Sequence, residues 1–307
     1  MGAQLRVYRR RIRSVQATKK ITKAMELIAS SKIVKAQNQL ETARPYGEAL
    51  YNAVAVAAGH AAAPGNHPLT SQPRLRQRAA VLVITSDRGL AGAYSYNALK
   101  EAEALYGLLE EQGIEAVPFV VGKKASTYYR FRGRDVGGSW QGFSDSPTPA
   151  DARPIADALL ERFLARTEDG GADFIYIVDT RYVNRVVQNT RATQILPLEV
   201  VEEADEAAAP EAGYYPLYSF EPNPEGVLDA LLPQYVEYLV YLALLNAAAS
   251  EHAARQRAMS AATDNASELI TTLTRRANQA RQAEITQEIS EIVGGADALS
   301  AASAGSE

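Results

Sequence analysis

The chain has 307 residues, 47% of them hydrophobic and 22% charged, and its formal net charge is −4. This composition excludes a disordered chain and predicts a folded, soluble protein. Because there is no cysteine, disulfides, thiolate nucleophiles and cysteine-ligated metals are excluded, and the three histidines lack the spacing of a metal site.

The first segment predicts a long helix that begins by Gln4. Pro45 should kink this helix, because a proline inside a helix removes one backbone hydrogen bond, and the helix should resume to about Ala58. No apolar run follows its basic residues, so we expect neither a secretory signal nor a spanning helix, and hence a cytoplasmic protein. Apolar residues at steps of three and four predict a face that packs on another helix. They are Leu5, Tyr8, Ile12, Val15, Ile21, Met25 and Ile28.

Basic charge is concentrated in this first helix. Residues 1–45 hold eleven Lys and Arg against two Glu, a net of +9, whereas residues 225–307 hold five Arg against eleven acids, a net of −6. Such crowding favours an acidic partner, or a solvated face that the acidic C-terminal helix partly neutralises. A nucleic-acid partner is less favoured, because the run lacks interleaved aromatic residues for stacking and no reading motif accompanies it.

The middle of the chain alternates strand and helix patterns after a proline- and glycine-rich linker at residues 63–78. Successive strand–helix–strand units pair in parallel through right-handed crossovers, which predicts a Rossmann-like, three-layer α/β domain. We expect strands at 79–85, 116–121 and 173–178, and helices at 94–112 and 150–166. Further strands are expected at 186–190, 195–201 and 214–220, with an exposed acidic loop at 202–213.

The loop at residues 86–92 stands where a phosphate-binding loop would stand. It has only two of the three glycines of a dinucleotide fingerprint, and the chain has no Walker motif. We therefore expect its glycines to serve the turn and the close packing of helix on sheet, and the pair Asp87 and Arg88 to make local contacts. No set of residues elsewhere predicts a catalytic or metal site.

The last segment predicts a second long helix, with Asn223 as its cap and Pro224 in its first turn. We expect a bend or a delayed start at Pro233, an end at Gly294 and Gly295, and a disordered tail. From Leu228 a spacing of 3.5 residues predicts a coiled coil, and residues 233–293 alone would span roughly 90 Å as a helix. The predicted seam is Leu228, Leu231, Tyr235, Tyr238, Leu242, Leu245, Ala249, His252, Gln256, Met259, Thr263, Ala266, Ile270, Leu273, Ala277 and Ala280.

Three parts of the chain resemble one family, the gamma subunit of F-type ATP synthases. Residues 21–32 (ITKAMELIASSK) are similar to its N-terminal signature, and residues 261–265 (AATDN) with 280–289 (ARQAEITQEI) to its C-terminal signature. The loop at 86–92 is also similar. The order of coiled coil, α/β domain and coiled coil matches over essentially the whole chain. The chain departs from the family at Ala91, often cysteine there, and at Ala277 and Gln279, commonly tyrosine and lysine.

The resemblance implies a central-stalk rotor subunit that is not itself an enzyme and holds no cofactor. In this family the terminal helices, here 1–60 with 222–307, form an antiparallel coiled coil inside a ring of three alpha and three beta subunits. The α/β domain, here 75–221, binds the epsilon subunit and the membrane ring of c subunits. Ion flow turns the rotor at the cytoplasmic face of the bacterial membrane, and the beta subunits make the ATP.

The resemblance also implies which residues touch the catalytic ring. One group passes an acidic lever of a beta subunit, and the other contacts a beta catch loop. The groups are Lys19, Lys20, Lys23 and Met25 in the first helix, and Arg281, Gln282 and Thr286 in the last. The runner-up interpretation is a basic coiled-coil scaffold that binds nucleic acid or an anionic membrane. A nucleotide-binding enzyme would depend on fold analogy alone.

Overall fold

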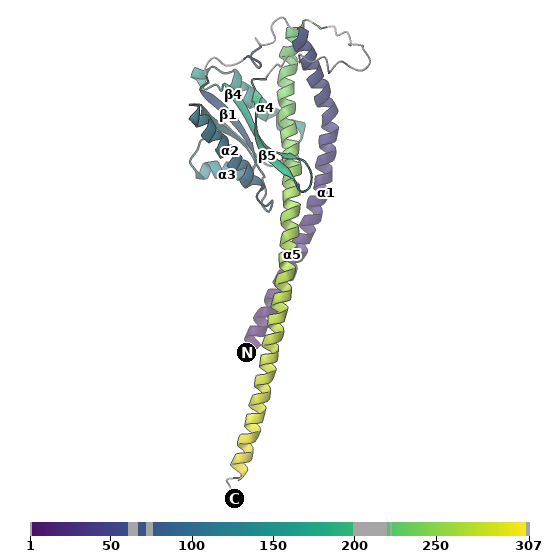
Figure 1. The fold of residues 1–307 in the computed structure, drawn as a ribbon, viewed down its shortest axis with the longest axis vertical. Helices are drawn as coiled ribbons and strands as arrows, with labels where there is room; N and C mark the ends of the chain where they lie inside the picture. The colour runs from purple at the N-terminus through teal and green to yellow at the C-terminus, as the bar shows by residue number, and fades with distance from the viewer. Residues whose placement is uncertain (1, 61–66, 72–75, 199–219, 222, 305–307) are drawn as a thin grey trace. The chain divides into compact units, whose positions relative to one another are not determined.

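The computed structural model describes residues 2–60, 67–71, 76–198, 220–221 and 223–304. Contacts divide the chain into two units, Met1–Ile28 with Gln256–Glu307, and Ala29–Arg255. Helix α1 (Gly2–His60) and helix α5 (Pro224–Ala304) contribute to both units. The larger unit also holds a five-stranded sheet and three shorter helices (Figure 1).

The sheet has the strand order β3-β2-β1-β4-β5. All its neighbours pair in parallel except β4 and β5, which are antiparallel. The strands are β1 (Arg78–Ile84), β2 (Glu115–Val121), β3 (Gly138–Trp140), β4 (Phe174–Tyr182) and β5 (Gln188–Leu196). The helices are α2 (Tyr94–Glu111), α3 (Lys123–Phe131) and α4 (Pro149–Leu164), and this arrangement confirms the predicted α/β fold class.

Alternate side chains of the sheet supply two separate cores. Leu82 and Ile84 of β1 pack with α4, α5 and the end of α1, whereas Val81 and Val83 pack with α2 and α3. Figure 1 shows α2 and α3 on the opposite face of the sheet from α5. Burial on both faces explains why β1 is a continuous apolar run.

Two elements in the middle of the chain were not predicted. Helix α3 buries only Ala125 and Tyr129, and β3 has three residues, so neither leaves a long periodic signal. Strands were expected at 186–190 and 195–201, and the described residues of these ranges contribute instead to one strand, β5, with a partly exposed alternating pattern. Residues 199–201 lie outside the described part. An edge strand tolerates such polar positions because it needs only one buried face. The predicted loop 202–213 and residues 214–219 lie outside the described part.

Helix α5 begins as predicted but continues further. The backbone amide of Gly226 donates to the side-chain oxygen of Asn223 at 2.7 Å, which confirms the cap. The expected end at Gly294 and Gly295 is wrong, because α5 runs to Ala304. Each glycine costs a helix interior only about 1 kcal/mol relative to alanine and here keeps a helical conformation. Both α1 and α5 are also helical across Pro45 and Pro233.

One stretch of α5 is long and apolar enough to cross a membrane by length and composition, with a mean hydropathy of 1.3. Val236, Val240 and Leu244 lie in this helix and are buried in the core between helices and sheet. Packing against the sheet therefore accounts for apolar residues on this helix.

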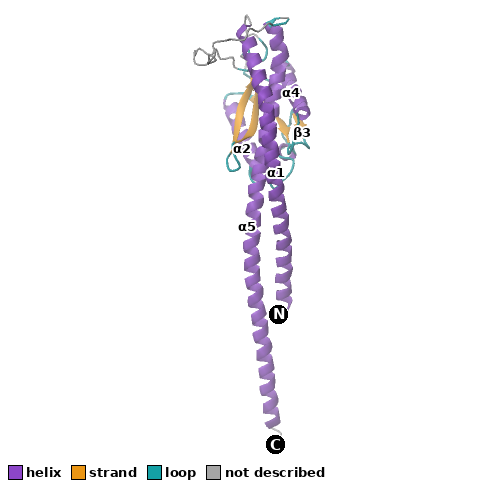
Figure 2. Cartoon of the chain, turned by 90° about the vertical axis from the view of Figure 1, so that its right-hand side faces the viewer, coloured by secondary structure: helices purple, strands orange, loops and turns teal. Residues whose placement is uncertain are grey.

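Helices α1 and α5 run in opposite directions. In the larger unit Tyr46 packs edge-on against Tyr238 and Tyr51 lies beside Tyr235, so positions rise along one helix as they fall along the other (Figure 2). In the smaller unit the predicted α5 seam is confirmed at Met259, Thr263, Ala266, Leu273 and Ala277, which are all buried.

The α1 seam of the smaller unit is shifted from its predicted position. Ile21 and Ile28 are 59% and 58% exposed, so their assignment to the seam is wrong, and Thr22 is buried instead. Steps of four and three residues from Val15 reach Lys19 and then Thr22, so the coiled-coil spacing of α1 continues. Ile21 and Ile28 each lie one position before a buried residue, Thr22 or Ala29. The Thr22 hydroxyl meets the Thr263 hydroxyl across the seam at 2.7 Å.

This hydroxyl pair makes a specific prediction. Thr22→Val alone or Thr263→Val alone should lower local stability by about 0.5–1.5 kcal/mol, because one partner of a buried hydrogen bond is lost. The double variant should return to or exceed the original stability, because two apolar groups of the same shape need no partner. Amide hydrogen exchange around residues 15–28 and 256–270 measures this. The exposed Thr271→Val serves as a control, and additive losses in the double variant would contradict the prediction.

Candidate functional site

The residues expected to touch the ring lie on two stretches of the smaller unit. Lys20 and Lys23 are exposed, while Lys19 and Met25 are half-buried on α1. Lys23 is held by Glu26 at 3.0 Å on the same helix. The expected residues of α5, Arg281, Gln282 and Thr286, are all exposed.

The two groups lie at different heights along the paired helices. Thr22 is opposite Thr263, so the α1 group is level with the part of α5 around that residue. Arg281 lies 18 positions further on, which is about 27 Å along a helix. The structure therefore places the two groups in separate belts, not in one site.

Six basic residues of α1 have no ion-pair partner on α5 within the residues that the structure describes. Within the described part of the chain, none of the following has a carboxylate at ion-pair distance: Arg9, Arg10, Arg11, Arg13, Lys19 and Lys20. The charge of these six residues is thus available to a partner, which favours an acidic partner over a self-neutralised face.

The loop at 86–92 is closed by its own acidic side chain. The carboxylate of Asp87 accepts backbone amides from Lys123 at 3.0 Å, Gly142 at 2.8 Å and Ser144 at 3.1 Å. Backbone amides at the start of a helix are the groups that bind phosphate in nucleotide-binding folds. Here Asp87 is the anion that accepts such an amide, that of Lys123 at the start of α3. The contacts of Asp87 are structural, but they reach distant parts of the chain and are not the local contacts that were expected.

Glycine is required where α3 meets the end of β1. Gly122 has φ of 92°, and a Cβ there would lie 2.3 Å from the carbonyl oxygen of Thr85. Gly92 also has a positive φ, of 55°. The value at Gly92 agrees with the turn role expected for the glycines of this loop. The expectation is not supported at Gly89, whose added Cβ would meet only the Lys124 Nζ atom, at 3.8 Å.

Helix α5 makes contacts at the crevice in which doubly wound sheets usually bind ligands. That crevice lies outside the carboxyl ends of the strands where the strand order reverses, here β1 and β4. Ser250 donates to the carbonyl oxygen of Thr180 at 2.9 Å, and Arg255 reaches the carbonyl oxygens of Arg88 and Gly89 at 3.5 and 3.4 Å. Polar groups of α5 therefore bind backbone carbonyl oxygens at this position.

A buried polar network joins α5 to α1 at this crevice. Glu251 accepts from Arg255 at 2.6 Å, His252 donates to the carbonyl oxygen of Asp145 at 2.9 Å, and Lys32 of α1 pairs with the Asp145 carboxylate. Burial raises the pKa of Glu251 and lowers the pKa of His252. Burial opposes ionisation of Asp145, but the hydrogen bond and charge of Lys32 lower its pKa overall.

Sequence reasoning missed this network, although a signal was present. Glu251 and Arg255 are four residues apart within a run of alanines, where a charged pair has no reason to occur unless it is satisfied by partners. The expected role of His252 as a seam residue omits its bond to the loop. Among described residues, no three His, Asp or Glu side chains are arranged for a metal.

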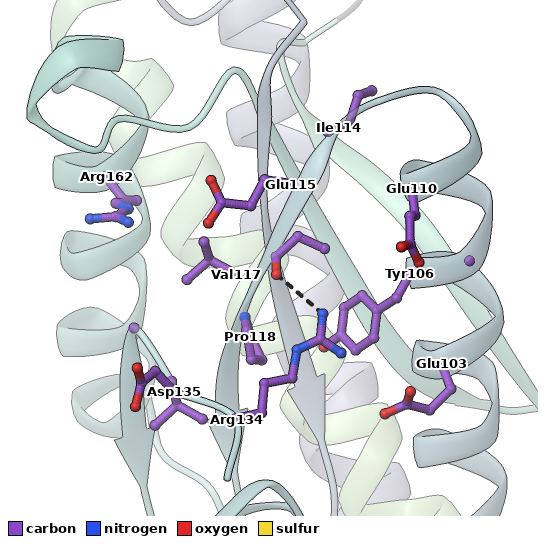
Figure 3. Close-up of a pocket in the computed structure, with 14 residues that line it drawn as sticks. Glu103, Tyr106, Glu110, Ile114, Glu115, Val117, Pro118, Arg134, Asp135 and Arg162 are labelled. Atoms are coloured by element: carbon purple, nitrogen blue, oxygen red, sulfur yellow. Dashed lines mark hydrogen bonds between the residues drawn. The ribbon is translucent and has the colours of Figure 1, made fainter. Parts of the chain in front are cut away.

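The cavity in Figure 3 lies at the edge of β2 that β3 leaves open. It has a volume of about 770 Å³, and Glu103, Glu110, Glu115 and Asp135 are among its lining residues (Figure 3). Arg134 donates to the carbonyl oxygen of Ala116 at 3.4 Å and lies over the Tyr106 ring. These lining residues include no nucleophile with an adjacent base.

Comparisons with known proteins agree with one another. A family model described as ATP synthase matches residues 4–299. The ATP synthase gamma chain of Thermobifida fusca is 56% identical over 307 residues, with all of both chains covered. That of Acidothermus cellulolyticus is 58% identical, with 97% of this chain and 98% of the relative covered.

Solved structures share the fold. A chain of the mitochondrial ATP synthase of Euglena gracilis, in an OSCP/F1/c-ring assembly, aligns with a TM-score of 0.65 and 17% identity, over 97% of this chain and 95% of that one. A chain from the central stalk and c-ring of the Tetrahymena thermophila enzyme aligns with a TM-score of 0.56 and 21% identity, over 79% of this chain and 99% of that one.

Proposed function

Because the chain belongs to the ATP synthase gamma chain family and is the central-stalk subunit of that rotary complex, we propose that it is non-catalytic itself. The observation that supports this most directly is the crevice of the α/β domain. Backbone amides there bind Asp87, and α5 donates to a backbone carbonyl oxygen at the end of β4, so the usual nucleotide position of the fold is used for internal contacts. The domain then acts as a mechanical connection.

The division of labour follows from the architecture. The proposed coiled-coil shaft comprises residues 1–60 with 222–307, and the proposed α/β domain comprises residues 75–221. The shaft turns inside a ring of alpha and beta subunits, while the domain binds the epsilon subunit and the ring of c subunits. Relatives solved within F1 and c-ring assemblies support these partners. The complex would then lie at the cytoplasmic face of the bacterial membrane.

The two belts of the shaft are the proposed contacts with the ring. The lower-numbered belt, Lys19, Lys20, Lys23 and Met25, belongs to a helix whose excess positive charge suits an acidic element of a beta subunit. The second belt, Arg281, Gln282 and Thr286, is exposed on α5 and offers a guanidinium, an amide and a hydroxyl for hydrogen bonding. The separation along the helix axis allows two different elements of the ring to be contacted at once.

The first test reverses charge in the lower-numbered belt. Lys19→Glu with Lys23→Glu should lower the initial rate of ATP-driven proton pumping several-fold, because like charges replace an attractive contact. The assembled complex should still form, since Lys23 is exposed and Lys19, although it lies at the edge of the seam, is only half-buried. Pumping is measured in inverted membrane vesicles, together with ATP hydrolysis.

The control carries the same charge change elsewhere on the chain. Arg44→Glu with Arg166→Glu alters two exposed positions of the larger unit and should leave pumping unchanged. Normal pumping in the Lys19 and Lys23 variant would rule out the assignment of this belt. The rotor function is tested separately by co-expression with alpha and beta subunits, where ATP turnover of the assembly should depend on the presence of this chain.

A further inference from the structure

A groove between α2 and α3 has no role in the function described so far. Its volume is about 790 Å³, and it lies on the face of the sheet opposite α4 and α5. Basic and aromatic side chains make up most of its lining. The lining residues that matter for the argument are Tyr96, Lys100, Lys123, Lys124, Tyr128 and Phe131.

The groove has a net positive charge. Lys100, Lys123 and Lys124 are exposed, and within the described residues none has a carboxylate at ion-pair distance. The two acids in the lining are already engaged. Asp87 accepts three backbone amides, and Glu103 lies 3.6 Å from Arg132. Three lysines are therefore left without an internal counter-charge.

Large aromatic side chains project beside these lysines. Phe131 is 91% exposed and Tyr96 is 67% exposed. Burial of apolar surface favours binding, so the exposed ring of Phe131 is a source of binding energy that this chain does not use itself. Aromatic residues surrounded by charge are typical of the residues that dominate protein–protein affinity.

The wall of the groove is fixed before any partner binds. The Tyr128 ring packs edge-on against Tyr129 at 5.2 Å and lies under the guanidinium of Arg132 at 4.6 Å. Tyr129 is fully buried, and its hydroxyl meets that of Tyr106 at 3.1 Å. A preformed surface loses little conformational entropy on binding, which favours affinity.

A nucleotide fits the groove less well than a protein does. Lysines and aromatic rings suit both, but the first amides of α3 are already used. Those of Lys123, Lys124 and Ala125 donate to Asp87, to the carbonyl oxygen of Ser86 and to the hydroxyl of Thr85. Phosphate would therefore be held by lysine side chains alone, without the amides that define phosphate sites.

We infer that this groove is the docking surface for an acidic segment of another protein subunit that turns with this chain. Carboxylates of that segment pair with Lys100, Lys123 and Lys124, and an apolar pocket of the same partner receives Phe131. The inference rests on the proposed function for the existence of such a subunit. Because the groove is on the sheet face away from α5, a partner can bind there without displacing that helix.

The first measurement is oxidative footprinting of the aromatic side chains. Phe131 and Tyr96 should react rapidly in the isolated chain and become at least tenfold slower in the purified membrane complex. ATP added to the isolated chain should leave both rates unchanged. Equal rates in the chain and the complex would overturn the inference, and so would protection by ATP alone.

The second measurement uses a variant of the surface. Phe131→Ser with Lys123→Glu and Lys124→Glu should weaken retention of one rotor subunit roughly 100-fold, as loss of an aromatic anchor and its charged neighbours does at other interfaces. The probes are the purified epsilon subunit and the purified c-ring, each titrated onto the full chain and followed by native mass spectrometry. Unchanged affinity for both would contradict the inference.

A matched control and a separate readout distinguish the two proposals. Leu164→Ser with Arg166→Glu and Arg44→Glu makes the same types of change at exposed sites outside the groove and should retain every subunit. ATP hydrolysis by the complex of alpha, beta and this chain should be unaffected by the groove variant. Loss of that hydrolysis would instead point to the shaft.

Discussion

Gly122→Ala is expected to lower the free energy of unfolding of the larger unit by about 2–6 kcal/mol. The backbone at Gly122 has φ of 92° and ψ of 145°, a region that is essentially confined to glycine and costs another residue roughly 1–3 kcal/mol. The added Cβ would also lie 2.3 Å from the Thr85 carbonyl oxygen, and such overpacking costs a further 1–3 kcal/mol or so. Equilibrium unfolding in urea measures the loss.

Gly113→Ala provides the comparison. Gly113 also has a positive φ, of 72°, but its Cβ would meet no atom within 4 Å. Only the strain of a positive φ at a non-glycine residue remains, so Gly113→Ala should lower the free energy of unfolding by about 1–2 kcal/mol. Equal losses at the two positions would show that the contact with Thr85 has no energetic weight.

Arg255→Met is expected to have a comparably large effect at neutral pH. Glu251 has a side chain only 1% exposed, and its Oε2 atom has no hydrogen-bond partner among the described residues. Removal of one member of a buried ion pair typically costs 3–5 kcal/mol or so, because an uncompensated charge remains. The double variant Glu251→Leu with Arg255→Met should recover most of this loss, since buried apolar residues replace the pair.

The pH dependence of this loss gives a second measurement. Burial raises the pKa of Glu251 in the folded chain, whereas Arg255 opposes the rise. A carboxyl with a raised folded pKa binds more protons when folded, so stability falls as pH rises from about 4.3 through the folded pKa. Without Arg255 that pKa should rise further, so the variant should be least impaired near pH 5. A loss that is equal at pH 5 and pH 8 would contradict this account.

The parts of the fold that could be predicted are those with strong periodic or continuous patterns. The buried strand β1 and the α5 seam are clear in the sequence because every third, fourth or consecutive residue is apolar. Helix α3 was missed because it buries only two residues, four positions apart, which is too short a pattern to establish a helical period. The shifted α1 seam was missed because buried Thr22 and Ala29 are smaller than exposed Ile21 and Ile28. Close helix packing selects small residues there, which hydropathy alone does not reveal.

The functional residues also fall into those that could be predicted from the sequence and those that could not. The expected ring contacts came from family resemblance, and their positions on exposed helix surface do not by themselves reveal a partner. The Asp87 cradle could not be predicted, because its amides come from Lys123, Gly142 and Ser144, which are far from Asp87 in the sequence. Only the folded chain brings them together.

Asp87 also bears on how the domain responds to its surroundings. In a nucleotide-binding domain, the arrangement around the phosphate loop varies with the concentration of the ligand. Here the anion is a side chain and its local concentration is fixed by the covalent chain, so the loop remains in one state whether ATP is abundant or scarce. The geometry of this loop therefore does not depend on the cellular concentration of ATP. That suits a subunit that transmits the same rotation during ATP synthesis and ATP hydrolysis.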